Sequence, residues 1–300
     1  MTLMLIDSAS LWYRAYYGMP DSFHAEDGTP VNAVRGYLDS LARLVSQYKP
    51  GRLIACIEGD WRPQWRVDLF PGYKANRLED EADEEEEPET LTPQIPIILE
   101  MLDAFGIPVV GADDYEADDV IATYSVKEKG PIRIVTGDRD LFQLIDRKKD
   151  VKVVYLAKGI AQHDLVDHLY VEKRYEIPGD RYALFAMLRG DPSDGLPGIK
   201  GIGEKGAAAI VRKYSSAEEI ERAAFAGHKD LSPAHAKKIL ADIEYLKIAP
   251  TLVHCALDVP LPKISHSLPK KPADISKIYQ LKDRYNLGAT VDRLIAALSW

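Results

Sequence analysis

Short, mostly apolar runs recur along the first half of the chain and are typical of buried strands. Between them, apolar residues return at the spacing of an amphipathic helix. We expect strands at residues 3–6, 53–57, 107–110, 132–135 and 151–156, and helices at 11–17, 31–48 and 93–104. Strands that alternate with helices predict a mostly parallel sheet in an α/β fold. From about residue 164 the pattern is helical, so we expect an α/β core over 1–163 and a helical region over 164–300.

The composition describes a chain that buries a sizeable core and carries its charge unevenly. It has 300 residues, 46% of them hydrophobic, and a formal net charge of −9. Residues 79–89 hold nine acids and no base, so the remainder is close to neutral. The acidic total therefore does not exclude a nucleic-acid partner, because charge segregation decides that question. On composition, the acidic segment 79–89 is expected to be solvated and mobile.

Cysteine usage and the N-terminus point to the cytoplasm. The two cysteines, Cys56 and Cys255, form no CxxC pair, so they predict neither a disulfide framework nor a zinc site. The N-terminus has no basic flank of a signal peptide, and no apolar run approaches the length of a membrane span. We expect a cytoplasmic protein without membrane contact.

Residues 113–119 place five carboxylates directly before an apolar helix. Glu116 and Asp119 lie three apart and share a helix face, where like charges repel unless a cation lies between them. The simpler interpretation is an acidic first helical turn, which suits the helix dipole.

Carboxylates also follow the predicted strands directly. Asp7, Glu58 with Asp60, and Asp138 with Asp140 should meet at the carboxyl edge of a parallel sheet, where such folds bind ligands. Each acid alone could be an ordinary turn residue or helix cap. Together with 116–119 and 191–194 they predict a shared site for Mg²⁺ or Mn²⁺, with room for two ions.

Residues 196–207 form a glycine-rich hairpin between predicted helices. Residues 201–206 match G-x-G-x-x-G, but a loop precedes them, so neither a dinucleotide fold nor a P-loop fits. The start of the following helix would expose backbone N–H groups to a DNA phosphate, with Lys200 and Lys205 as added charges. A plain helix–turn–helix packing element is the alternative.

Residues 62–77 are rich in bases and aromatic rings, which could hold a phosphodiester beside an acidic site. Lys74 and Arg77 would share a face if this segment is helical, and Arg14 is a further cation. Lysines and arginines that snorkel along an amphipathic helix are the alternative.

Taken together and in their order along the chain, the motifs of this sequence resemble those of the structure-specific 5′ nucleases, most closely the N-terminal 5′-nuclease domain of bacterial DNA polymerase I. The matching stretches are Ile6-Asp7 with Tyr13-Arg14, YKANR at 73–77, YEADDV at 115–120, TGDRDL at 136–141 and GDPSDGLPGIKGIGEK at 190–205. The resemblance implies a PIN-like core, a helix-three-turn-helix at about 184–213, and two-metal hydrolysis of DNA at 5′ flaps, nicks or gaps in primer removal and repair. RNA-primed 5′ ends are possible further substrates, and a monomer is expected.

The resemblance also assigns roles to residues. The metals would be held by Asp7, Glu58 or Asp60, Glu116, Asp118, Asp119, Asp138, Asp140, Asp191 and Asp194. Lys74, Arg77 and Arg14 would act on the scissile and neighbouring phosphates, in a reaction without a covalent intermediate. Tyr73, Lys200, Gly201, Gly203 and Lys205 would contact DNA, and the hairpin is a candidate K⁺ site.

The sequence departs from the family pattern in three places. Neither Glu58 nor Asp60 reproduces the usual spacing of the second-strand aspartate, the family's Ser-Asp-Asn ends in Gly195, and the segment after Arg77 is acidic, which puts strand threading in doubt. No polymerase segment follows within the 300 residues, so a freestanding nuclease is expected. The competing hypotheses are a PIN-type ribonuclease and a non-catalytic DNA-structure-binding protein.

Overall fold

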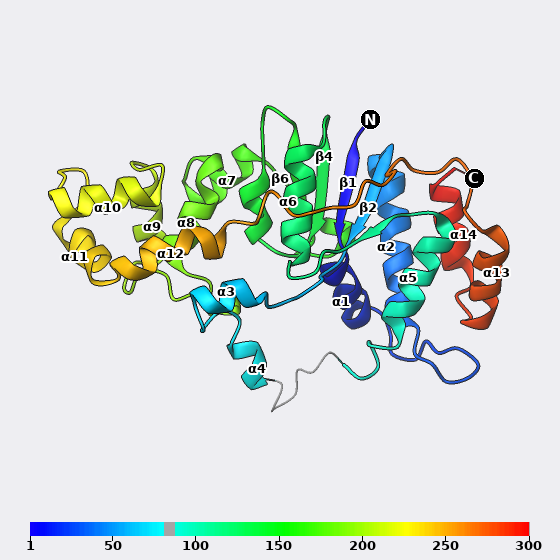
Figure 1. Ribbon diagram of the computed structural model, residues 1–300. Coiled ribbons are helices and arrows are strands. Elements are labelled where there is room, and N and C mark those ends of the chain that lie inside the picture. Colours follow the sequence, from blue (N-terminus) through cyan, green and yellow to red (C-terminus); the bar gives the residue numbers. More distant parts are fainter. Residues whose placement is uncertain (81–87, 300) are drawn as a thin grey trace.

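The computed structural model describes residues 1–80 and 88–299, and it centres on one six-stranded sheet (Figure 1). The strand order is β3-β2-β1-β4-β5-β6, and all neighbours are parallel except β5 and β6. The strands are β1 Leu3–Asp7, β2 Arg52–Cys56, β3 Val109–Val110, β4 Ile132–Thr136, β5 Val151–Tyr155 and β6 Asp164–Val166. The predicted mostly parallel α/β fold is confirmed.

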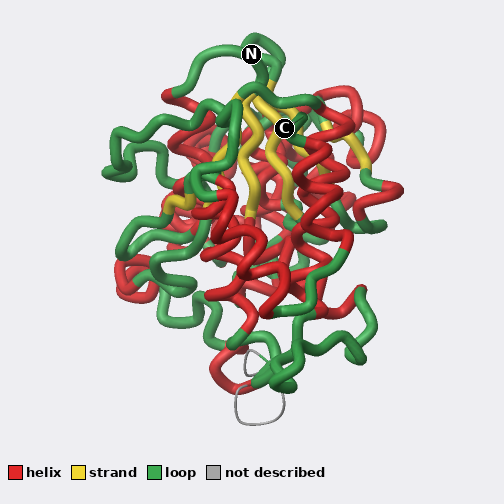
Figure 2. The backbone as a smooth tube through the Cα atoms, turned by 90° about the vertical axis from the view of Figure 1, so that its right-hand side faces the viewer, coloured by secondary structure: helices red, strands yellow, loops and turns green. Residues whose placement is uncertain are grey.

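Alternate residues of the strands enter two separate cores, as the two-residue period of a strand requires. In β1, Leu3 and Leu5 pack into one core, while Met4 and Ile6 pack into the other. Both faces of the sheet are therefore buried, which explains why the strands read as continuous apolar runs. Figure 2 shows the strands enclosed by helices.

Helices from both ends of the chain cover the Met4 and Ile6 side of the sheet. They are α1 Ser8–Gly18, α2 Asn32–Tyr48, α5 Gln94–Phe105, α13 Ile275–Arg284 and α14 Ala289–Ala297. The C-terminal helices α13 and α14 contact α5 and α2 respectively, although each pair is far apart in the sequence (Figure 1).

The other core continues away from the sheet into the helical region, which forms one end of the molecule (Figure 1). The helices of this core are α6 Ala117–Lys127, α7 His168–Tyr175, α8 Tyr182–Arg189, α9 Glu204–Val211, α10 Ala217–Ala226, α11 Pro233–Ala241 and α12 Ile243–Val253. Short elements complete the fold: α3 Gln64–Leu69, α4 Asn76–Asp80, η1 Asp140–Leu144, η2 Ile160–Gln162, η3 Gly179–Arg181 and η4 Pro192–Asp194. The predicted helical region with a helix–loop–helix around the glycine hairpin is confirmed.

Several local predictions need correction or remain as proposals. The helical pattern expected from residue 164 is wrong at its start, because β6 adds an antiparallel edge strand there. The division at residue 163 stays a proposal, although α13 and α14 return to the α/β core. Of the acidic segment 79–89, residues 81–87 lie outside the described residues, so its expected mobility is not addressed.

Candidate active site

A cleft of about 350 Å³ opens at the carboxyl edge of the sheet, where β1, β2 and β4 end. Asp7 ends β1, Glu58 follows β2, and Asp138 follows β4, so parallel strands bring them to one place as expected. Asp118 and Glu116 reach the cleft from the start of α6. The charged residues of its lining are Asp7, Arg14, Glu58, Lys74, Arg77, Glu116, Asp118 and Asp138.

Thr136, the last residue of β4, links two of these acidic residues. Its hydroxyl donates to Asp7 Oδ2 at 2.7 Å, and its oxygen accepts the backbone N–H of Asp138 at 2.9 Å. Asp7 Oδ1 also caps α1 by accepting the N–H of Ser10 at 3.0 Å. The prediction assigned no role to Thr136, although a hydroxyl directly before Gly-Asp at a strand end was a usable signal.

Arg66 supplies the cation that the spacing of Glu116 and Asp119 called for. Its guanidinium donates to Asp119 at 2.7 and 2.8 Å and to Glu116 Oε1 at 2.9 Å. Asp119 is fully buried, and its remaining contacts are backbone N–H groups, including that of Ala256 at 2.7 Å. These contacts argue against the predicted role of Asp119 as a metal ligand, because its oxygens are already engaged inside the protein.

Lys74 and Tyr73 both turn toward Glu116. Lys74 Nζ donates to the Glu116 carboxylate and, at 3.1 Å, to the carbonyl of Trp61. Burial would lower the pKa of Lys74, but the Glu116 charge holds it above its usual value, so the side chain stays an ammonium. The Tyr73 hydroxyl donates to Glu116 Oε1 at 2.6 Å, and the ring is 3% exposed. This burial argues against the predicted DNA contact of Tyr73, because a buried ring does not offer its face to a base.

Residues 72–77 dock onto the loop at 192–195 instead of forming one helix. Lys74 has φ of 50°, in the left-handed region, and α4 begins only at Asn76, so the helical face proposed for Lys74 and Arg77 does not exist. Both side chains still line the cleft. Lys74 N donates to the carbonyl of Asp194 at 2.9 Å, and Arg77 Nη2 pairs with Asp194 Oδ1 at 2.8 Å.

The same loop explains the departure at Gly195. This residue has φ of +67°, and a Cβ built on it would lie 2.3 Å from the carbonyl oxygen of Gly72. The close approach of two backbone segments thus favours glycine where the family pattern has asparagine.

The acids of the cleft repel one another and are partly removed from water. Burial raises the pKa of Asp118 well above its usual range, and the nearby charge of Asp138 is the second largest cause. Burial also raises the pKa of Asp138, and Asp7 is the neighbouring charge that adds most to this effect. Burial raises the pKa of Glu58 to about 7, against the opposing effect of Lys74. A divalent cation would reverse each of these penalties.

Three more predicted ligands, Asp140, Asp191 and Asp194, lie near enough to Asp138 for the charges to interact. Burial and then the Asp138 charge raise the pKa of Asp140, and burial also raises that of Asp194. Asp191 caps η4, accepting the N–H of Ser193 at 3.0 Å, and pairs with Arg189 at 3.3 Å. These residues do not line the cleft, but their charges act on those that do.

Of the two second-strand candidates, only Glu58 lines the cleft. Asp60 instead accepts the N–H of Arg62 at 2.9 Å in the turn that follows. Within the described part of the chain, no three acidic, histidine or cysteine side chains converge into a ready metal cage. The donors are nonetheless all carboxylate oxygens with unfavourable mutual repulsion, which fits ions such as Mg²⁺ that keep several of their waters.

The glycine hairpin lies on the helical side of the cleft, between α8 and α9. Gly203 caps α9, and Lys200, Gly201, Gly203 and Lys205 are all exposed, as DNA contacts require. The hairpin is held from behind: Lys238 Nζ donates to the carbonyl of Gly201 at 2.7 Å. A protein ammonium thus already binds one carbonyl of the hairpin that is the candidate K⁺ site.

The described part of the chain has no helix that is both long and apolar enough to cross a membrane.

Comparisons with known proteins cover nearly the whole chain. Residues 2–176 match the family described as 5′-3′ exonuclease, N-terminal resolvase-like domain, and residues 177–276 match 5′-3′ exonuclease, C-terminal SAM fold. A 5′-3′ exonuclease of Streptomyces coelicolor is 48% identical over 99% of this chain and 100% of that protein. A DNA polymerase I of Mycobacterium bovis is 34% identical over 99% of this chain and 32% of the polymerase.

Solved structures share the fold at low sequence identity. A T5 5′-exonuclease with divalent metal ions (zinc) bound has a TM-score of 0.64 and 19% identity, and the match covers 100% of this chain and 97% of that chain. A bacteriophage T5 flap endonuclease in a pseudo-enzyme-product complex with DNA and metal ions has a TM-score of 0.66 and 17% identity, covering both chains in full.

Proposed function

The chain belongs to the 5′-3′ exonuclease family, and we propose that it cuts DNA at 5′ flaps, nicks or gaps with Mg²⁺ or Mn²⁺. It is a nuclease, by its 48% identity to a 5′-3′ exonuclease over 99% of this chain and 100% of that protein. The observation that carries the proposal is the carboxylate cleft, in which mutually repelling acids face a buried lysine.

We assign the metal ions to the acids that line the cleft: Asp7, Glu58, Glu116, Asp118 and Asp138. Asp140, Asp191 and Asp194 would act through water or through charge alone. Asp119 is left out because, unlike Glu116, it is fully buried and does not line the cleft. When bound, divalent ions would activate water and stabilise charge on the leaving oxygen.

The cations of the cleft hold and orient the phosphodiester. Lys74, charged and fixed by Glu116 and Trp61, would stabilise the negative charge that develops on the scissile phosphate. Arg77 is fixed by Asp194, and Arg14 lies over Gly137 at the cleft mouth, so both would hold neighbouring phosphates.

The exposed hairpin supports the choice of duplex DNA as the substrate. The N-terminus of α9 and the side chains of Lys200 and Lys205 suit backbone phosphates that are contacted without reading bases. RNA-primed 5′ ends, a monomeric state and a hairpin K⁺ ion remain part of the proposal. The two free cysteines support a cytoplasmic location.

The test is cleavage of a 5′-labelled flap duplex with Mg²⁺ or Mn²⁺ against EDTA. Asp138→Asn should lower the rate by about 10²-fold or more, because it removes one acid of the cleft. Asp60→Asn is the matched control and should cut normally, whereas Glu58→Gln should be impaired. Cutting in EDTA, or full activity of Asp138→Asn, would overturn the assignment.

A further inference from the structure

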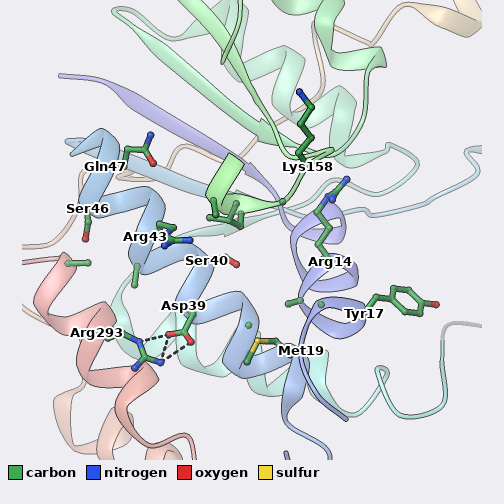
Figure 3. Close-up of a pocket in the computed structure, with 18 of the residues that line it drawn as sticks. Arg14, Tyr17, Met19, Asp39, Ser40, Arg43, Ser46, Gln47, Lys158 and Arg293 are labelled. Atoms are coloured by element: carbon green, nitrogen blue, oxygen red, sulfur yellow. Dashed lines mark hydrogen bonds and ion pairs between the residues drawn. The ribbon is translucent and has the colours of Figure 1, made fainter. Parts of the chain in front are cut away.

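A larger groove of about 1430 Å³ opens next to the carboxylate cleft (Figure 3). Its walls are α1, α2, α14 and the loop at 158–161. Tyr13 and Arg14 line both the groove and the cleft, so the two spaces adjoin at these side chains. The groove exceeds the roughly 300–1,000 Å³ of pockets that hold one small molecule.

The groove carries a net positive charge. Arg14 and Arg43 form no ion pair within residues 1–80 and 88–299, and Lys158 shares only a 3.3 Å pair with Asp164. The one acid of the lining, Asp39, is held by two contacts of 2.8 Å to Arg293 (Figure 3). Figure 3 shows Arg14, Arg43 and Lys158 on three different elements around the space. This arrangement suits successive phosphates of a strand.

Apolar and hydroxyl groups lie between these cations. Met19, Ala42 and Ile160 provide apolar contact, and Ser40 and Ser46 provide hydrogen-bonding groups. A duplex presents mainly its phosphates to a protein, whereas an unpaired strand also needs surfaces for its bases. The mixed lining therefore favours an unpaired strand.

The position of the groove gives the direction of that strand. The hairpin and α9 lie toward one end of the molecule, and α2 and α14 lie toward the other, with the sheet between them (Figure 1). A duplex gripped at the hairpin would place its scissile phosphate in the cleft. The chain beyond that phosphate would then meet Arg14 first and the groove next.

We propose that this groove binds the unpaired 5′ strand of the substrate, with Arg14 at its entrance and Arg43 and Lys158 along its length. The proposal rests on the proposed function. It implies that affinity grows with the length of the 5′ flap until the groove is filled.

The test compares Arg43→Gln and Lys158→Gln with the wild type on two duplexes that differ only in flap length, one nucleotide against about eight. Binding is measured in EDTA, so that no substrate is cut, and KM is measured with Mg²⁺. Each substitution should weaken binding of the long flap about twofold to fivefold, as for an exposed charge contact, and should leave the short flap unchanged. The salt dependence should also become shallower by about 0.7 per lost phosphate contact.

Lys270→Gln is the control, because Lys270 is exposed in the segment that runs along the start of β2, at the opposite edge of the sheet. Equal effects on both flap lengths, or effects that depend on the upstream duplex, would overturn the proposal. A failure of the proposed function can be told apart from a failure of this proposal. In that case the wild type would cut neither substrate with Mg²⁺, while the binding measurements in EDTA would still test the groove.

Discussion

Replacing Arg66 tests how the start of α6 is held against the rest of the site. Arg66 is 4% exposed, and its guanidinium makes two contacts to the fully buried Asp119 and one to Glu116. Arg66→Met keeps much of the side-chain volume but leaves the buried Asp119 without its cation and Glu116 with Lys74 alone. Removing one partner of a buried ion pair typically costs about 3–5 kcal/mol. We expect a loss of that size in the free energy of unfolding.

Chemical denaturation of the metal-free protein measures this loss, and Arg293→Met is the matched control. Arg293 also contacts an aspartate, Asp39, through two nitrogens at 2.8 Å, but that pair is partly exposed. Its loss should cost at most about 1 kcal/mol. Both arginines make paired contacts to an aspartate, so the difference in the free energy of unfolding between the two variants reports mainly the effect of burial.

A second substitution separates charge from packing. If the cost comes from an unpaired carboxylate, Asp119→Asn should recover part of the stability of Arg66→Met, although alone it should destabilise the protein. A loss below about 1 kcal/mol in Arg66→Met, or purely additive effects of the two changes, would refute the argument that Arg66 neutralises this cluster.

Three further predictions concern the cleft and its supports. Gly137→Ala would place a Cβ 2.8 Å from Arg14 Nε, so kcat/KM should fall while Tm changes little. Gly195→Asn, which restores the family residue, should lower Tm because its Cβ would lie 2.3 Å from the Gly72 carbonyl oxygen. An unchanged Tm would show that the backbone around Gly72 can shift to make room. The pKa of Glu58, raised to about 7, means that its contribution to stability is lost as pH rises through that value. The Tm of the metal-free protein should therefore fall as the pH rises from about 4.5 to about 7 and should level off above that, and Mn²⁺ should flatten the profile; a flat metal-free profile would contradict this.

The sequence predicted best the elements marked by a continuous apolar run or by a long helical period. The buried strands β1, β2, β4 and β5 and the long helix α2 all lie within about two residues of their expected bounds. The edge strand β6 was missed because three residues are too few for an alternating pattern to be recognised. Its existence depends on pairing with β5, which is a tertiary contact.

The site was predicted less completely because side-chain direction depends on local backbone geometry. The segment at 72–77 contributes Lys74 and Arg77 to the cleft, yet Tyr73 between α3 and Lys74 turns inward to Glu116. The left-handed conformation of Lys74 makes this possible, and a helical spacing argument could not foresee it. Likewise, Glu58 and Asp60 look equivalent in sequence, and only the turn after β2 directs Glu58 into the cleft.

The carboxylates at the start of α6 show why such a cluster cannot be counted as one site. Consecutive helical residues are rotated by about 100°, so Asp118 and Asp119 must face different surroundings. Asp119 turns inward to Arg66, whereas Asp118 faces the cleft, where its pKa is raised. Glu116 lies between the two and contacts both Arg66 and Lys74. One face of the helix start is thus fixed by the buried Arg66, while Asp118 on the other face has no ion pair in the described residues. The buried pair of Asp119 and Arg66 orients the face to which we assign a metal ion.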